Sequence, residues 1–200
     1  MKKKVLIVGG VAGGASAAAR LRRLDEDAEI IMFEKGEYIS FANCGLPYYI
    51  GDVIPTREAL IVQTVEQMSR KFNLDIRNLS EVISINKEEK EVRVKNHRTG
   101  EVYEESYDTL VLSPGAKPIK PPIAGIEDCK TLFTLRNIPD MDNIKSFLEE
   151  EKPKRAIVIG GGFIGLEMAE NLHEKGVNVT LVEGSNQVMG PLDIEMASII

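Results

Sequence analysis

Three features of the sequence combine residue types and spacings that can do chemistry. Glycines form two turns, one in KVLIVGGVAGG from Lys4 and one in RAIVIGGGFIG from Arg155. Each turn follows a short apolar run and precedes a helix-forming stretch, which is the context in which backbone N–H groups bind a dinucleotide pyrophosphate. The third feature is Cys44, whose thiolate could take part in sulfur exchange or oxidation. Together the three features point to redox chemistry with dinucleotides.

The second glycine turn fits the pattern Gly-x-Gly-x-x-Gly at every position. Gly160 permits the tight turn, Gly162 lets the backbone approach the pyrophosphate, and Gly165 permits close packing of the helix. Glu183 ends the next apolar run, where a carboxylate can accept hydrogen bonds from ribose hydroxyls. A carboxylate there repels a 2′-phosphate and no arginine follows in EGSNQ, so we favour NADH and leave NADPH open. The alternative is a glycine-rich turn without a ligand.

The first glycine turn is less regular, because Val11 occupies the place of the middle glycine. Gly9 and Gly14 hold the outer positions, and Glu34 ends the following apolar run. A protein with two dinucleotide turns usually passes electrons between the two nucleotides. We therefore assign FAD to the first turn and NAD(P)H to the second.

The two turns belong to an internal repeat. Residues 4–34 and 155–183 each read as strand, glycine turn, helix, strand and acid, the order of a βαβ unit in a parallel sheet. Between the repeats, Asp108–Leu112 reads as another buried strand. Three further segments alternate in the manner of antiparallel strands, namely Glu81–Asn86, Glu91–Lys95 and Glu101–Tyr107.

The expected fold class is α/β, with two Rossmann-like, three-layer domains. The proline-rich stretch Lys117–Gly125 should connect them, with a helix at Asp140–Glu150 and another at Asp193–Ile200. Residues 1–120 are expected to be the first segment of an FAD-binding domain. Residues 121–200 are expected to be the connector and the beginning of an NAD(P)H-binding domain. Two strands cannot cover both faces of their helix, so we expect the second domain to be incomplete.

Composition excludes several classes of function. Hydrophobic content of 43% and charge of 28% are ordinary for a globular protein, and a net charge of −6 gives no general attraction to nucleic acid or membrane. No window approaches the ~18 apolar residues of a membrane span. Two isolated histidines, expected on the surface, give no metal site. With two cysteines and no secretory signal, we expect a cytoplasmic protein.

Cys44 lies in the stretch YISFANCGLPYYIGD, which has neither helical nor strand periodicity, so we expect a loop. A buried cysteine is by default a small hydrophobe. Cys129 lies beyond the proline-rich connector, and we interpret it as structural. No second cysteine lies within five residues of Cys44, which excludes a CxxxxC exchange. A lone thiolate must instead cycle through a mixed disulfide, a sulfenic acid or a persulfide.

Several stretches resemble the single-cysteine branch of the pyridine nucleotide-disulfide oxidoreductases, namely SFANCGLPYYIG, GGVAGGASAAARLRRLD, SPGAKP, FTLRN and GGGFIGLEMAENL. The resemblance implies an FAD-dependent homodimer that reduces CoA disulfide with NAD(P)H through a Cys44–CoA mixed disulfide. Three alternatives stay open. They are a CoA persulfide or polysulfide reductase with a downstream rhodanese domain, an NADH oxidase with a Cys44 sulfenic acid, and a flavin-binding redox sensor without turnover.

The resemblance also implies which residues contact the ligands. The flavin contacts are Gly9, Val11, Ala12, Gly13, Gly14, Glu34, Lys35, Val82, Ser113, Gly115 and Arg136. The NAD(P)H contacts are Gly160, Gly162, Phe163, Ile164, Gly165, Glu167 and Glu183. The CoA contacts are Ser16, Arg20, Arg23, Ser40, Asn43 and Lys71.

The helix after the first turn supports a CoA-type substrate on physical grounds. Ser16, Arg20 and Arg23 are spaced i, i+4 and i+7, which puts them on one stripe that could bind the phosphates of CoA. The alternative is a solvated basic face. Arg20 departs from the glutamine usual in the family, although an arginine suits a phosphate. The opposite, core-facing stripe is expected to consist of Ala17, Leu21 and Leu24.

Overall fold

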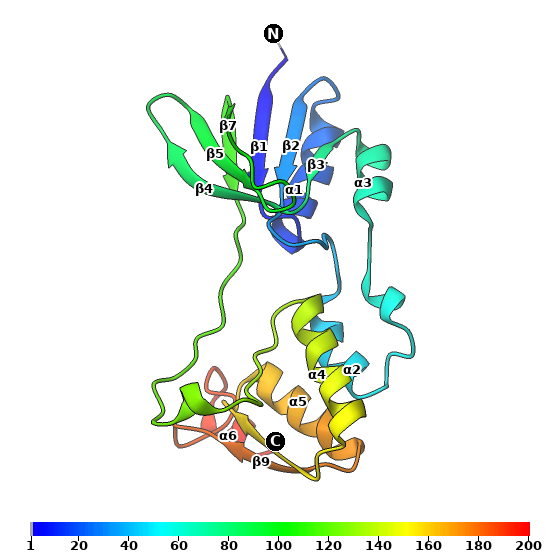
Figure 1. The fold of residues 1–200 in the computed structure, drawn as a ribbon, viewed down its shortest axis with the longest axis vertical. Helices are drawn as coiled ribbons and strands as arrows, with labels where there is room; N and C mark the ends of the chain where they lie inside the picture. Colours follow the sequence, from blue (N-terminus) through cyan, green and yellow to red (C-terminus); the bar gives the residue numbers. More distant parts are fainter. Residues whose placement is uncertain (1) are drawn as a thin grey trace. The chain divides into compact units, whose positions relative to one another are not determined.

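The structure is a computed structural model that describes residues 2–200 (Figure 1). The chain divides into two compact units. The first comprises the residues up to Phe41 together with Ile61–Ala116, and the second comprises Ala42–Leu60 and Lys117–Ile200. The segment Ala42–Leu60, which carries Cys44, therefore lies in the second unit, whereas the sequence placed it among the first 120 residues.

A parallel four-stranded sheet with the order β3-β2-β1-β7 forms the centre of the first unit. The strands are β1 (Lys4–Val8), β2 (Glu29–Phe33), β3 (Asp75–Arg77) and β7 (Thr109–Leu112). Helix α1 (Ala12–Leu24) connects β1 to β2, and α3 (Val65–Phe72) precedes β3. Strand β7 pairs only with β1, and Leu112 is 56% exposed. The strand expected at residues 108–112 is therefore present, but its expected burial is wrong because it forms the sheet edge.

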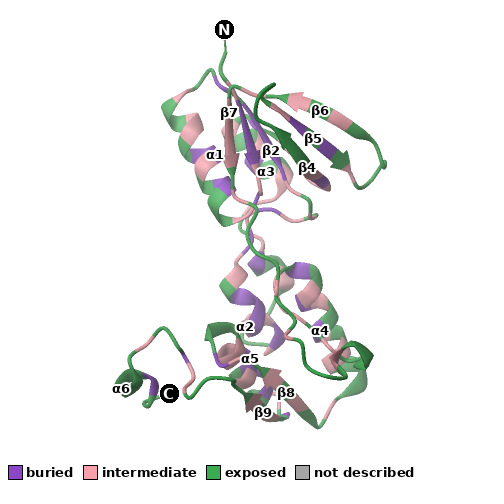
Figure 2. Cartoon of the chain, turned by 90° about the vertical axis from the view of Figure 1, so that its left-hand side faces the viewer, coloured by how far each residue is buried: buried purple, intermediate pink, exposed green. Residues whose placement is uncertain are grey.

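Alternate residues of the central strands face different layers, as the period of two in a strand requires. Val5 and Ile7 belong to the cluster that includes buried residues of α1 and α3. Leu6 and Phe33 belong to a second cluster with β5. That cluster lies under an antiparallel sheet of β4 (Ser80–Asn86), β5 (Glu91–Asn96) and β6 (Val102–Ser106). Helices, parallel sheet and antiparallel sheet thus form the three expected layers, and α1, β2 and β5 each carry buried residues (Figure 2).

Small residues of α1 face the sheet. Ala15, Ala18 and Ala19 are buried, whereas Leu24 is 67% exposed. The expected core-facing stripe is therefore wrong at Leu24, although Leu21 does pack against the core cluster. The physical reason is that small alanine side chains let the helix pack close to the sheet. The face that carries them is therefore the one turned towards the sheet.

The second unit contains the second βαβ repeat. Strands β8 (Arg155–Ile159) and β9 (Asn178–Val182) pair in parallel and are joined by α5 (Phe163–Glu174). This two-stranded sheet leaves apolar side chains exposed to solvent, and Ile157 is 70% exposed. The expected repeat is confirmed.

Two helices from distant parts of the sequence accompany the repeat. Helix α4 (Ile138–Glu151) begins where the Asn137 side chain accepts a hydrogen bond from the Asp140 amide at 2.9 Å, an N-cap. The short α2 (Leu46–Ile50) packs against α4 and α5. Helix α6 (Ile194–Ala197) is shorter than the expected helix over residues 193–200. The 3₁₀ turns are η1 (Asn43–Gly45), η2 (Arg57–Leu60) and η3 (Ile126–Asp128). Within residues 2–200, the helices are all too short or too polar to cross a membrane.

Candidate dinucleotide and thiol sites

The first glycine turn leaves the carboxyl end of β1 and enters α1. Gly9 has φ +99°, and a Cβ on it would lie 2.0 Å from the Ser113 carbonyl oxygen. A Cβ on Gly14 would lie 1.7 Å from the Gly9 carbonyl oxygen. Because no side chain fits at either position, Gly9 permits the tight turn and Gly14 permits α1 to pack closely against it. The first amides of α1 are then placed where they can bind a pyrophosphate. Val11 at the middle position serves as the N-cap residue of α1.

Glu34 and Ser113 border this turn. The Glu34 carboxylate accepts hydrogen bonds from the Gly10 and Gly36 amides, both at 2.8 Å. Ser113 follows β7, and its Oγ would lie 3.1 Å from a Cβ on Gly13. The structure therefore brings together the glycines, the strand-end acid and Ser113, three parts of the chain expected to share a flavin site.

The remaining expected flavin contacts occupy varied positions. Ala12 and Lys35 are exposed next to the turn and the acid, and Val82 is half-buried on β4. Gly115 has φ +70°, a backbone conformation that residues with a side chain rarely adopt. Arg136, whose amide donates to Asp140 at 2.9 Å, lies in the second compact unit. These placements leave their flavin roles as predictions.

The second glycine turn repeats the geometry of the first. Gly160 has φ +105°, its amide donates to the Val182 carbonyl at 2.8 Å, and a Cβ on Gly165 would lie 1.8 Å from its carbonyl oxygen. Gly162 is the N-cap of α5 and has no side chain to occupy the helix end. The unpaired N–H groups at this helix start are available to an anion.

Glu183 organises the second turn electrostatically. Its carboxylate accepts hydrogen bonds from the Ser185 amide at 2.8 Å, the Gly161 amide at 2.6 Å and the Ser185 hydroxyl at 2.9 Å. These bonds, the one from the Ser185 amide first, lower the pKa of Glu183 to about 2. The carboxylate is therefore ionised at neutral pH and exposed beside the turn, where a ribose hydroxyl could donate to it.

The start of α5 presents apolar side chains to solvent. Phe163 is 62% exposed and Ile164 is 55% exposed, while Glu167 one turn further is half-buried. The negative charge of Glu167 raises the pKa of Tyr48 of α2, followed by burial, Glu170 and Cys44. Tyr48 therefore lies in the electrostatic field of acidic residues on α5. The exposed face next to the glycines is consistent with a planar ring binding there.

Cys44 lies in η1, directly before α2, and its side chain is exposed. The expected loop is therefore wrong: a helix shorter than two turns shows no periodicity, and Pro47 in its first turn favours the helix start. A Cβ on Gly45 would lie 2.6 Å from Leu60 Cδ2, so the residue after the cysteine is held tightly. Cys129 is exposed too, with its Sγ 3.7 Å from Thr131 Oγ1, and its interpretation as structural stays a prediction.

The expected CoA contacts on α1 do share one solvent-facing stripe. Ser16, Arg20 and Arg23 are all exposed, and Arg23 Nε donates to the Ala19 carbonyl at 3.1 Å. Ser40 lies close to the first glycine turn, because its amide donates to the Gly10 carbonyl at 3.0 Å. Asn43, in contrast, precedes Cys44 in the second unit.

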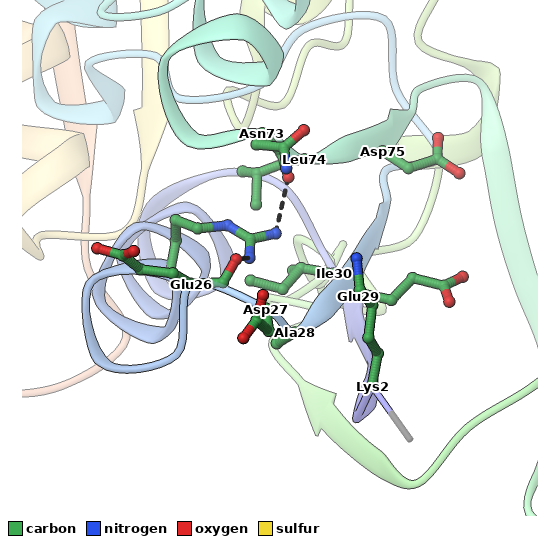
Figure 3. A pocket seen from close by; sticks show the side chains of 10 residues that line it. Lys2, Glu26, Asp27, Ala28, Glu29, Ile30, Asn73, Leu74 and Asp75 are labelled. Carbon is green, nitrogen blue, oxygen red and sulfur yellow. Dashed lines mark hydrogen bonds between the residues drawn. The ribbon is translucent and has the colours of Figure 1, made fainter.

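Lys71 lines a surface depression of the first unit, together with Ile61, Val62, Gln63, Glu66, Gln67 and Arg70. A second depression, at the amino-terminal end of β2, contains no expected site residue (Figure 3). Arg22 reaches across it and donates to the Phe72 carbonyl at 2.9 Å and the Asn73 carbonyl at 2.8 Å. This arginine is engaged by backbone carbonyls and connects the end of α1 to the end of α3.

Sequence reasoning missed the residues that hold α2 in the second unit. Asn171 of α5 is 2% exposed, and a Cβ on Gly51 would lie 2.0 Å from its Oδ1. The Asp52 carboxylate pairs with Lys145 of α4 and with Lys175 at the end of α5. Asn171 is one of three polar residues in GLEMAENL, so the sequence held no signal of its burial. Nothing in the sequence pointed from Asp52 to its two partners.

Comparisons with known proteins agree with this geometry. Residues 3–200 match the family of pyridine nucleotide-disulphide oxidoreductases. The coenzyme A disulfide reductase of Staphylococcus epidermidis is 45% identical over 193 residues, which are 96% of this chain and 43% of that protein. This chain therefore spans less than half the length of that relative.

Two solved structures are similar over nearly the whole chain. Reduced Bacillus anthracis CoADR-RHD is 67% identical with a TM-score of 0.97, and the match covers 100% of this chain and 36% of that one. An NAD-dependent persulfide reductase from A. fulgidus is 38% identical with a TM-score of 0.91, and the match covers 98% of this chain and 36% of that one.

Proposed function

Because this chain belongs to the pyridine nucleotide-disulphide oxidoreductase family, we propose that it reduces CoA disulfide with NAD(P)H, using FAD and the single cysteine Cys44. The observation that carries the proposal is the placement of Cys44. It is an exposed thiol in η1, directly before α2. Helix α2 packs on α5, the helix that follows the second glycine turn. The 45% identity to a coenzyme A disulfide reductase supports the choice of substrate.

The residues present fit both dinucleotides. At Gly9 and Gly14, and at Gly165 in the second turn, a Cβ would collide with backbone, so glycine is required for the turn and for close helix packing. The N–H groups at the starts of α1 and α5 would bind the two pyrophosphates. Glu34 and Glu183 add a ribose-binding carboxylate to each turn. When bound, FAD supplies a two-electron carrier between a nicotinamide and a disulfide. The first turn with Ser113 would hold it, and the second turn with Phe163, Ile164 and Glu167 would hold NAD(P)H.

Cys44 performs the sulfur chemistry. Its thiolate attacks one sulfur of CoA disulfide, the S–S bond breaks, one CoA thiolate leaves, and a Cys44–CoA disulfide forms. Two electrons from NADH then break this mixed disulfide, and the second CoA thiol leaves after protonation. The thiolate of Cys44 is regenerated for the next cycle. Over one cycle, NADH and one proton convert one CoA disulfide into two CoA thiols and NAD⁺.

The substrate phosphates need cationic partners, and α1 offers them. Arg20 and Arg23 are exposed on the same stripe as Ser16. A guanidinium presents several donors in a plane and suits a phosphate. We propose that this stripe, with Ser40 and Lys71 of the same unit, recognises the nucleotide part of CoA, and that Asn43 contacts CoA next to Cys44.

A steady-state assay separates this proposal from its alternatives. NADH consumption is measured with CoA disulfide, CoA persulfide and O₂ as acceptors, in the FAD-loaded protein. We expect CoA disulfide to give the highest kcat/KM. Preference for the persulfide would favour the second candidate, which the similarity to a persulfide reductase supports. CoA-independent turnover with O₂ would indicate an oxidase, and flavin reduction without turnover would indicate a redox sensor.

Cys44→Ser tests the role of the thiol, with Cys129→Ser as the matched control. We expect Cys44→Ser to lower disulfide turnover by at least ~10³-fold, because serine cannot form the mixed disulfide, while FAD stays bound. The Cys129→Ser variant should keep wild-type turnover. Full activity of Cys44→Ser would overturn the proposed function.

A further inference from the structure

The contact between α2 and α5 depends on one glycine. Gly51 ends α2, and a Cβ there would lie 2.0 Å from Asn171 Oδ1, 2.7 Å from its Cγ and 2.8 Å from its Cβ. Such distances are incompatible with a side chain, so only glycine allows the two helices to approach this closely. Asn171 cannot simply turn aside, because it is 2% exposed and its Nδ2 donates to the Glu167 carbonyl at 2.8 Å. The fixed side-chain amide of Asn171 therefore limits how closely α2 can approach α5.

An ionic tether holds the same end of α2. Asp52 follows Gly51 and pairs with Lys145 and Lys175, which lower the pKa of its carboxyl, Lys145 more than Lys175. Lys145 Nζ also donates to the Tyr49 carbonyl at 3.0 Å and lies 4.5 Å from the centroid of the Tyr49 ring. Each exposed pair alone contributes little stability. Two lysines from different helices on one carboxylate nevertheless restrict where α2 can lie.

The other end of α2 carries the thiol. The helix has only five residues, and Gly45 connects it to Cys44 through a turn closed by the Gly45 amide and the Ala42 carbonyl at 3.0 Å. A shift at Gly51 therefore moves Cys44 as well. Tyr48 lies between the two ends, within the electrostatic field of both Glu167 and Cys44. A change in the contact between Gly51 and Asn171 would therefore be transmitted along α2 to Cys44.

We propose that Gly51 and Asn171 are positioning residues that fix α2 on α5. By doing so, they set the position of Cys44, which directly precedes α2, relative to Glu167. The inference rests on the proposed function, in which Cys44 accepts electrons that enter through the nucleotide bound at α5. In this proposal both residues act through Cys44.

Gly51→Ala is the direct test, made in the FAD-loaded full-length protein. The added methyl group must push α2 away from Asn171, and misplacement of a reacting group by about 1 Å can cost ~10²-fold in rate. We expect kcat for CoA disulfide to fall 10- to 100-fold, with KM for NADH and the rate of flavin reduction by NADH within about twofold of wild type. Gly190→Ala is the matched control, because its Cβ meets no atom within 4 Å among the described residues.

Partial rescue distinguishes positioning from general destabilisation. Asn171→Ala removes the two atoms nearest to the new methyl group, so the Gly51→Ala/Asn171→Ala double variant should regain part of the lost kcat. Independent structural damage would instead add in the double variant. Should Gly51→Ala not fold, Asn171→Ala alone decides, because it removes the amide group that limits the approach of Gly51. We expect a two- to fivefold loss of kcat with unchanged flavin reduction, and no loss would overturn the proposal.

The outcomes separate this inference from the proposed function. Full kcat in Gly51→Ala, with an inactive Cys44→Ser, overturns the positioning role alone. A fall in flavin reduction equal to the fall in kcat also overturns it, because the effect would then lie before Cys44. Full turnover of Cys44→Ser overturns the proposed function itself.

Discussion

The two glycine turns are built from the same backbone hydrogen bonds, and they differ in what surrounds them. In both, the first glycine amide donates at 2.8 Å to the last residue of the neighbouring strand, Phe33 or Val182. In both, the next glycine amide donates to the acid after that strand, at 2.8 Å to Glu34 and at 2.6 Å to Glu183. The local sequence therefore specifies the same turn twice.

The surroundings of the first glycine separate the two turns. Strand β1 has a neighbour on each side, so a Cβ on Gly9 would meet the Ser113 backbone after β7. Strand β8 has one neighbour, and a Cβ on Gly160 would meet no atom within 4 Å among residues 2–200. At the first turn the neighbouring strand restricts Gly9, whereas at the second turn backbone conformation alone restricts Gly160.

The largest expected difference between the turns is in stability. In Gly9→Ala, the alanine must adopt a positive φ, and its Cβ also clashes with the Ser113 backbone. We therefore expect a destabilisation of about 3 kcal/mol or more. Gly160→Ala should cost only about 1–2 kcal/mol, from backbone conformation. Denaturant unfolding of the two variants measures both values. Equal losses would contradict the idea that β7 is what distinguishes the turns.

A smaller difference is expected in nucleotide choice. Glu183→Gln removes the charge that should repel a 2′-phosphate, so the ratio of NADPH to NADH affinity should rise roughly tenfold, about 1.4 kcal/mol. Glu34→Gln is the control, because the first turn is proposed to bind FAD, and it should leave the ratio unchanged. Titrations of both variants with NADH and NADPH give the ratios. A shift in Glu34→Gln alone would reverse the assignment of the two turns.

The smallest expected effect is a pH dependence of the second turn. The folded-state pKa of Glu183, about 2, lies below its ordinary value of 4.5, so its hydrogen bonds stabilise the turn fully above about pH 4.5. This contribution is lost as the pH falls from 4.5 towards 2. Hydrogen exchange of the Gly161 amide should therefore lose protection in this window. In Glu183→Gln the loss should be absent, and equal pH profiles would contradict the role of the carboxylate.

Much of the fold could be predicted from periodicity and turn chemistry. The alternating strands between residues 80 and 106 and both βαβ units lie where the sequence indicated them. Predictions failed where burial depends on partners distant in sequence. Leu24 is exposed because alanines, not leucines, set the face of α1, and β7 is less buried than expected because it is an edge strand. The helix after Cys44 escaped detection because five residues are too few to show a period.

For the candidate site, the sequence by itself determined the two turns, their acids and the lone cysteine. These features depend on residues close together in the chain, where a missing Cβ or a strand-end carboxylate has a local consequence. Only the tertiary structure decided that Gly51 rests on Asn171 and that Asp52 joins Lys145 to Lys175. Such contacts join residues far apart in the sequence, and they form only when packing brings the helices and strands together.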